Sequence, residues 1–99
     1  RDYVRHLREC VERLKPRARL AWFLRAFYGL ASRDIGTHPG IAARPGTVDL
    51  MVHRGRAALA ECMRRKGLDP REMPPGTFIA LWEYFHALRL QGEARAHES

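Results

Sequence analysis

The sequence predicts an all-α fold: a helical bundle that contains a helix-turn-helix, with an amphipathic helix appended at its C-terminal end. Three observations lead to this prediction. Apolar residues recur at spacings of three and four along much of the chain, as they do on one face of an α-helix. Proline and glycine divide the chain into segments of helical length. A short segment, a glycine-containing turn and a longer segment with basic residues on its outer faces follow one another in residues 32–56, which is the helix-turn-helix plan.

The first two helices are predicted over residues 2–14 and 17–28. In the first, apolar residues form one seam and charged residues cover the outside. Pro16 suits the first position of the second helix, where its missing N–H is no loss, and Gly29 is a candidate C-cap. The second helix holds the densest aromatic stretch, with Trp22 and Tyr28 flanking its main stripe. The residues predicted to form the core there are Leu20, Phe23, Leu24 and Phe27.

A short helix is predicted to begin with Ser32 as its N-cap, with Asp34 favourable in its first turn. Pro39 prevents this helix from continuing much past residue 38. Gly40 is expected to supply the positive φ of a sharp turn, and Ile41 to plug the core between the two helices. Residues 42–45 would then form an enlarged turn.

The longer helix is predicted to be capped by Gly46 or Thr47 and to run to about Lys66. Its apolar stripe is formed by residues at i, i+4, i+7 and i+11, which are Val48, Val52, Gly55 and Leu59. The outward faces of this helix, together with neighbouring basic residues, are the predicted DNA-binding site. The candidate contact residues are Arg33, Arg44, Thr47, Asp49, Leu50, His53, Arg54 and Arg56.

The C-terminal third is predicted to contain a Pro-rich linker over residues 67–76, an amphipathic helix over residues 77–90 and a polar tail over residues 91–99. The apolar stripe of the helix is long enough that it has to pack somewhere. Packing on the first two helices is the favoured arrangement, and a partner-binding or dimer-forming helix is the alternative. The stripe consists of Phe78, Leu81, Trp82, Phe85 and Leu88.

The charge of the chain is concentrated in its first two thirds. Residues 1–66 contain 15 Lys or Arg against 6 Asp or Glu, a net +9, whereas residues 67–99 carry a net −2. A basic region of this kind is the electrostatic footprint expected of phosphate binding. Two cysteines do not suggest a disulfide framework, and Cys10 is expected to be a half-buried thiol beside His6 rather than half of a zinc site. No metal or cofactor is expected, and no long apolar run predicts a membrane span.

Five short motifs occur in a fixed order in the central part of the chain. They are Leu14-Lys15-Pro16-Arg17-Ala18-Arg19, Asp34-Ile35-Gly36, Gly40-Ile41, Gly46-Thr47-Val48 and Arg54-Gly55-Arg56 with Leu59. In order and spacing, the chain from about residue 11 to residue 66 resembles region four of bacterial RNA polymerase sigma factors, the C-terminal promoter-binding domain, most closely that of the extracytoplasmic-function type. Glycine stands at 36 and 55 where the family usually has alanine, and two extra residues lie between Ile35 and Thr47.

The resemblance implies recognition of the upstream minus-thirty-five promoter element in transcription initiation. It implies double-stranded promoter DNA, the RNA polymerase core through its β flap, and an anti-sigma factor as partners, with a cytoplasmic location and no membrane association. In the family, the helices that correspond to residues 17–28 help to form the flap-docking surface. Because the sequence begins at Arg1 without methionine, we expect a fragment. The family's polymerase-binding and promoter-melting domain would be the missing part.

Two other functions are compatible with the sequence. The chain could be a dimeric helix-turn-helix transcriptional regulator, with residues 78–88 supplying the interface, or a sigma-like protein-interaction module regulated by a partner. An enzyme is not expected, because no nucleophile–base pair, carboxylate pair or glycine-rich phosphate loop occurs with usable spacing.

Overall fold

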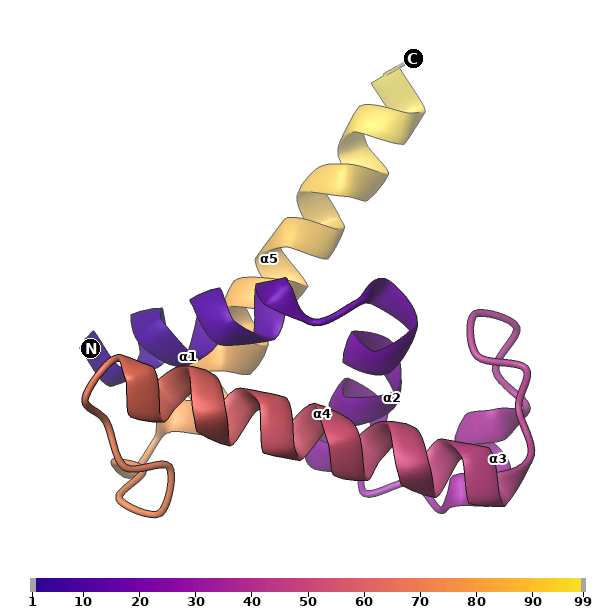
Figure 1. The fold of residues 1–99 in the computed structure, drawn as a ribbon. Coiled ribbons are helices and arrows are strands. Elements are labelled where there is room, and N and C mark those ends of the chain that lie inside the picture. Colours follow the sequence, from indigo (N-terminus) through magenta and orange to yellow (C-terminus); the bar gives the residue numbers. More distant parts are fainter. Residues whose placement is uncertain (1, 99) are drawn as a thin grey trace.

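The computed structural model describes the backbone of residues 2–98 and the side chains of residues 3–87. Every regular element of this described backbone is an α-helix, so the predicted all-α class is confirmed (Figure 1). The helices are α1 (Asp2–Arg13), α2 (Pro16–Tyr28), α3 (Ser32–Gly36), α4 (Pro45–Arg65) and α5 (Thr77–Glu98).

Helix α4 is the element against which most of the others pack. It contacts α1, α2 and α3, whereas α5 packs on α1. In Figure 1, α1 lies beside the C-terminal half of α4 and α3 lies at its N-terminal end. The two ends of α4 therefore belong to different parts of the molecule.

The buried apolar residues form two clusters, one toward each end of α4. The α3-side cluster joins α2, α3, the α3–α4 connection and the first half of α4, and it consists of Ala21, Ile35, Ile41, Val48 and Val52. The α1-side cluster joins α1, α2, the second half of α4 and α5. Its buried members are Leu7, Cys10, Val11, Leu14, Trp22, Leu59, Met63 and Leu81.

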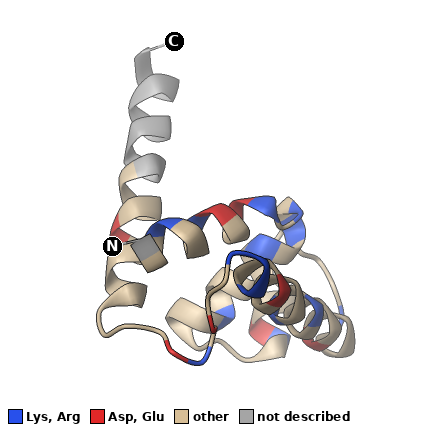
Figure 2. Ribbon diagram, turned by 60° about the vertical axis from the view of Figure 1, so that its left-hand side comes forward, with Lys and Arg blue, Asp and Glu red and all other residues tan. Residues whose placement is uncertain are grey.

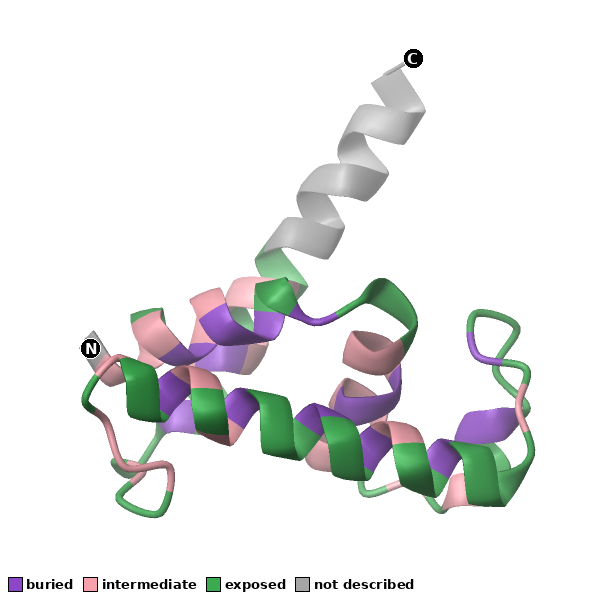
Figure 3. Ribbon diagram, in the orientation of Figure 1, coloured by how far each residue is buried: buried purple, intermediate pink, exposed green. Residues whose placement is uncertain are grey.

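The predicted apolar stripe of α4 is confirmed. Val48, Val52 and Leu59 are 0%, 2% and 6% exposed, and Gly55 is also buried. Met63 extends the same stripe by one turn, and the opposite side of the helix is exposed along its whole length (Figure 3). Ile41, 2% exposed, plugs the core as expected.

The predicted core stripe of α2 needs a correction. Leu20, Phe23, Leu24 and Phe27 are only half-buried, whereas Ala21 and Trp22 are buried. The reason is that the predicted stripe is divided between the two clusters. Trp22 packs toward Gly55 of α4 in the interior. Leu20 and Leu24 lie at the edge of the α3-side cluster, and Phe23 and Phe27 lie at the edge of the α1-side cluster. Phe23 meets Phe85 with ring centroids 6.1 Å apart, and Phe27 meets Phe78 at 5.4 Å.

The predicted N-caps of the central helices were wrong by one to three residues. Ala31, not Ser32, is the N-cap of α3, because the Ser32 hydroxyl is engaged with side chains of α2 and α4. The N-cap of α4 is Arg44, and Pro45 is its first helical residue rather than part of the turn. The fixed φ of proline is suited to this first position, where no N–H is needed.

The positive φ expected at Gly40 lies instead at Ala42, with φ 47°. Gly40 instead lies close to α2. A Cβ atom on it would lie 2.9 Å from Cδ2 of Leu20, so a larger residue here would need the end of the Leu20 side chain to shift. Gly29 does adopt the left-handed conformation (φ 62°) and caps α2 as predicted.

Helix α5 packs within the chain, as the sequence analysis favoured. Leu81 is 0% exposed in the α1-side cluster, and Trp82 and Phe85 are half-buried. The helix runs to Glu98, eight residues beyond its expected end. The side chain of Leu88 and those of the expected polar tail, residues 91–99, lie outside the described residues.

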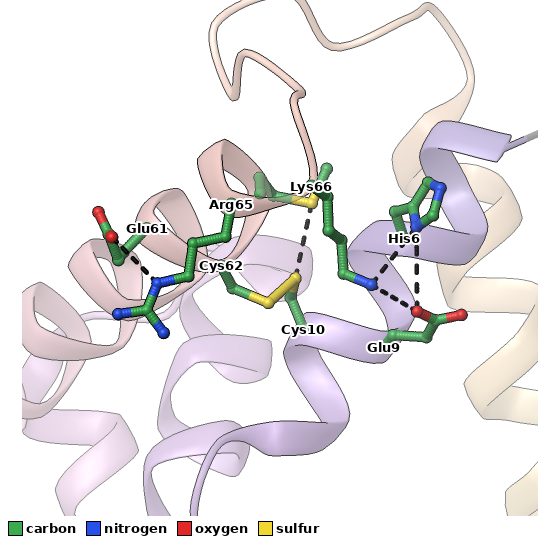
Figure 4. The surroundings of a disulfide bond; sticks show 8 residues. His6, Glu9, Cys10, Glu61, Cys62, Arg65 and Lys66 are labelled. Atoms are coloured by element: carbon green, nitrogen blue, oxygen red, sulfur yellow. Dashed lines mark hydrogen bonds and ion pairs between the residues drawn. A yellow bond between two sulfur atoms is a disulfide. The ribbon is translucent and has the colours of Figure 1, made fainter.

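The expectation of a free thiol at Cys10 was wrong. Cys10 is 1% exposed and forms a disulfide with Cys62, which links α1 to α4 across 52 residues of chain (Figure 4). The two residues come together only because α1 packs beside α4, with their Cα atoms 5.8 Å apart. Closing a loop of this length stabilises the folded state by roughly 4 kcal/mol in the chain-entropy model.

Candidate nucleic-acid interface

The connection between α3 and α4, residues 37–44, is held by its own backbone hydrogen bonds. The amide of Ala42 donates to the carbonyl of His38 at 2.8 Å, and the amide of Ala43 donates to Gly36 at 3.1 Å. The His38 side chain takes part as well, because its Nδ1 accepts from the amide of Gly40 at 2.9 Å. These bonds give an eight-residue segment a defined path between the two helices.

Arg17, at the start of α2, donates hydrogen bonds to backbone carbonyls of this connection. Its Nε and Nη2 donate to the Ile41 carbonyl at 2.8 and 2.6 Å, and Nη2 also lies 3.4 Å from the Ala42 carbonyl. The two bonds to Ile41 use the fork geometry of the guanidinium group, which fixes direction as well as distance. Arg17 therefore anchors the connection to α2.

Gly36 allows the connection to turn back onto α3. A Cβ atom at this position would lie 2.1 Å from the carbonyl oxygen of Ala43 and 3.5 Å from Val48. Backbone therefore occupies the space that an alanine methyl would need. The returning connection accounts for glycine at a position where the resembling family usually has alanine.

The N-terminus of α4 has no side-chain cap. Arg44 is the N-cap without a side-chain cap hydrogen bond, and no acidic residue lies in the first turn. The first helical bond is donated by the Val48 amide to the Arg44 carbonyl at 3.0 Å. The N–H groups of Gly46 and Thr47 precede it and have no carbonyl to bind within the helix. They add to the positive end of the helix dipole.

All eight predicted contact residues are exposed. With 100° between successive helical residues, those on α4 fall on two sides of its exposed surface. Thr47, Leu50 and Arg54 lie on one side; Asp49, His53 and Arg56 lie on the other. Arg33 lies on α3 and Arg44 at the N-cap of α4, so both stand near the uncapped helix end.

The basic residues of the candidate interface are unpaired. Among the described residues, the guanidinium groups of Arg33, Arg44, Arg54 and Arg56 form no hydrogen bond or ion pair with another side chain or carbonyl. Basic positions occur on several helices (Figure 2), but many of the others are engaged. Those that bind acidic side chains or carbonyls include Arg17, Arg19, Arg25, Arg64, Arg65, Lys66 and Arg71.

Asp49 is held by groups outside α4. Its Oδ1 accepts a hydrogen bond from the Ser32 hydroxyl and lies 3.6 Å from Nη2 of Arg25, which also donates to Ser32. The three side chains thus tie the end of α2, the start of α3 and the second turn of α4 together. Asp49 was predicted to read bases. In the structure, its side chain instead helps to position α3 and α4 relative to the end of α2.

Replacing Asp49 with asparagine tests this role. Because the Asp49 side chain is 65% exposed, we expect the free energy of unfolding to fall by less than about 1 kcal/mol. Removing a negative charge beside the unpaired arginines should strengthen binding to all duplexes by a similar factor. Chemical denaturation and binding to duplexes of different sequence would measure both effects. A change in base preference without a general gain in affinity would instead make Asp49 a base-reading residue.

Sequence reasoning missed Arg17 and Arg25, which shape the site without being part of its surface. Arg17 binds a carbonyl 24 residues away, and the partners of Arg25 lie on the following two helices. No local pattern marks either residue, because each bond depends on how the helices pack. Leu50, 45% exposed, is an apolar residue on the same side of α4 as Arg54.

No protein-family model matches the chain, and no curated protein or solved structure was found to be similar to it. Within the described residues, no helix combines the length and hydrophobicity needed to cross a membrane.

Proposed function

We propose that the chain binds double-stranded DNA through α3, the connection and α4, which act as a helix-turn-helix. The observation that carries the proposal is a set of four unpaired arginines next to the uncapped helix α4. Arg33 lies on α3, Arg44 is the N-cap of α4, and Arg54 and Arg56 lie near the middle of α4. Unpaired surface arginines and free helix N–H groups are the groups that proteins use to hold phosphates. The packing of α3 and α4 through Ile35, Ile41 and Val48 supports a rigid presentation of this surface.

In this proposal the N-terminal half of α4 enters the major groove. Arg44, Arg33 and the first N–H groups of α4 hold the backbone on either side. We expect Arg54 to pair with a guanine edge and Leu50 to contact a thymine methyl group. The phosphate contacts set the register of the helix, and the base contacts provide the sequence preference.

Together with the order of the five motifs, this surface supports a role as region four of a sigma factor that reads the minus-thirty-five element in the cytoplasm. RNA polymerase core and an anti-sigma factor are then the proposed protein partners. α5 covers Phe23 and Phe27 of α2. A β-flap contact on this face would therefore have to use its exposed end at Tyr28, which is 55% exposed, or displace α5.

A protein-interaction module is the second candidate. It is favoured by three large apolar residues that remain exposed. Leu50 on α4 is 45% exposed, and Phe78 and Ile79 on α5 are 39% and 68% exposed. A dimeric regulator is less well supported, since Leu81 and Phe85, which would form its interface, are used for packing within the chain.

The proposal predicts that Arg54→Ala weakens binding to the preferred duplex about tenfold or more, because a bidentate contact to guanine is worth about 1–3 kcal/mol. We would select bound sequences from a randomised duplex library at two salt concentrations and then measure the affinity of each variant. Arg71→Ala is the matched control. It removes the same charge from an 88% exposed side chain in the segment that follows the C-terminal end of α4.

An asymmetric enriched sequence that loses its advantage in Arg54→Ala, but not in Arg71→Ala, would support promoter reading. A palindrome would indicate a dimeric regulator. Salt-sensitive binding without any enriched sequence would contradict base recognition and favour the interaction module.

A further inference from the structure

The disulfide between Cys10 and Cys62 lies at the boundary between core and solvent. Cys10 is 1% exposed, and its sulfur lies 3.7 Å from Sδ of Met63. Cys62 is half-buried, on the turn of α4 next to the surface. Cys10 is therefore the enclosed residue of the pair, and Cys62 is the partly exposed one.

Two ion pairs flank the disulfide (Figure 4). Lys66 donates to Glu9 of α1 at 2.6 Å, and Arg65 donates to Glu61 at 3.2 Å. The Lys66 ammonium holds the pKa of Glu9 below its usual value through this hydrogen bond. Each of the two cations is paired with a carboxylate, so these four groups together leave no net charge beside the disulfide.

The disulfide cross-links only the part of the molecule that contains the α1-side cluster. Both sulfurs belong to residues packed in or against the α1-side cluster, whereas the α3-side cluster contains no cysteine. α5 is bound to α1, because Tyr84 of α5 donates a hydrogen bond to Glu12 of α1 at 3.2 Å and Arg8 of α1 lies 4.5 Å from the Tyr84 ring centre. Holding α1 against α4 therefore also holds the base of α5.

We propose that Cys10 and Cys62 form a redox modification site that controls how firmly α1 and α5 are held to the rest of the chain. The reaction is thiol–disulfide exchange with a dithiol. A thiolate of the dithiol attacks the sulfur of Cys62, the less buried of the two residues, the bond to Cys10 breaks, and Cys10 leaves as a thiolate that takes up a proton. The second thiol of the dithiol then displaces Cys62 as a thiol, and the dithiol becomes a cyclic disulfide.

The oxidised state keeps the cross-link, and the reduced state retains only apolar packing and surface ion pairs between α1 and α4. Reducing compartments normally keep protein thiols reduced, so a cross-link in such a compartment reports an oxidising change. The expected response is local. α1 and α5 open more often after reduction, while α3 and the first half of α4 keep their structure because the α3-side cluster is unchanged.

The test compares the oxidised and the dithiothreitol-reduced 99-residue chain, with oxidised and reduced glutathione used to set the redox state. Alkylation and mass measurement would count free thiols, and hydrogen exchange would be followed for each helix. We expect two thiols to appear on reduction, Tm to fall by on the order of 10 °C or more, and amide exchange in α1 to rise about tenfold or more. Exchange in α3 and at the start of α4 should change by less than about twofold.

The double variant Cys10→Ser/Cys62→Ser is the control, and its exchange should not respond to dithiothreitol. The comparison of the two wild-type states needs no variant, so it remains decisive if the control does not fold. Free thiols under oxidising glutathione, equal exchange in both states, or an increase spread evenly over all helices would each overturn the proposal. No DNA is present in this experiment, so its outcome is separate from that of the proposed DNA binding.

Discussion

Replacing Gly36 with alanine is expected to lower the free energy of unfolding by about 3 kcal/mol. The added methyl group would meet the Ala43 carbonyl oxygen at 2.1 Å, and this neighbour is backbone rather than the end of a flexible side chain. The connection would have to move away from α3. That movement would break the bond from the Ala43 amide to Gly36 and disturb the carbonyl of the neighbouring Ala42, which Arg17 approaches.

Gly46→Ala is the matched control, because no atom lies within 4 Å of its Cβ position and it occupies the first turn of α4. Alanine there should leave stability unchanged or raise it by up to about 1 kcal/mol. Urea denaturation of the two variants measures the difference. Equal stability of both would mean that the connection does not return to Gly36 as described. DNA binding should also weaken in Gly36→Ala, since Arg44 lies at the end of the displaced segment.

Replacing Leu81 with alanine is expected to destabilise the chain by about 3 kcal/mol, within the range found for buried leucines. Leu81 is 0% exposed and is the member of α5 that is buried in the α1-side cluster. The loss combines the removed apolar contacts with the cavity left between α1, α4 and α5. A loss of stability of this size would show that α5 is part of the hydrophobic core.

Ile79→Ala is the control for this prediction. Ile79 lies on the same helix, loses a side chain of the same size and is 68% exposed, so its loss should cost about 0.5 kcal/mol or less. Thermal or chemical denaturation would distinguish the two variants. If both variants were equally mild, α5 would not be packed on the cluster in solution. If Ile79→Ala alone impaired binding to a protein partner, the exposed face of α5 would be the contact surface.

The periodicity of the sequence determined the helices well. The stripe of Val48, Val52, Gly55 and Leu59 could be recognised because a helix repeats its faces every three to four residues, so the buried face is visible in the spacing alone. The same reasoning placed Ile41 in the core and Gly29 at the end of α2, since each depends on its immediate neighbours.

The spacing of apolar residues was less informative for α2, which packs against more than one other helix. The stripe of α2 belongs to the densest aromatic stretch of the sequence, yet Ala21 and Trp22 are more deeply buried. Periodicity identifies an apolar face, but it does not say whether that face meets the interior or a single covering helix. The N-caps were misplaced for a related reason, because Ser32 binds side chains that approach from other helices.

For the candidate interface, the sequence by itself determined which residues of α3, the connection and α4 could be exposed, and all eight candidates are exposed. Only the tertiary structure distinguished the unpaired arginines from Asp49, which is bound to Ser32 and lies beside Arg25. It also decided that Arg17 anchors the connection and that Cys10 meets Cys62 across 52 residues. Local patterns record the faces of each helix, whereas contacts between distant residues depend on how the helices are placed against one another.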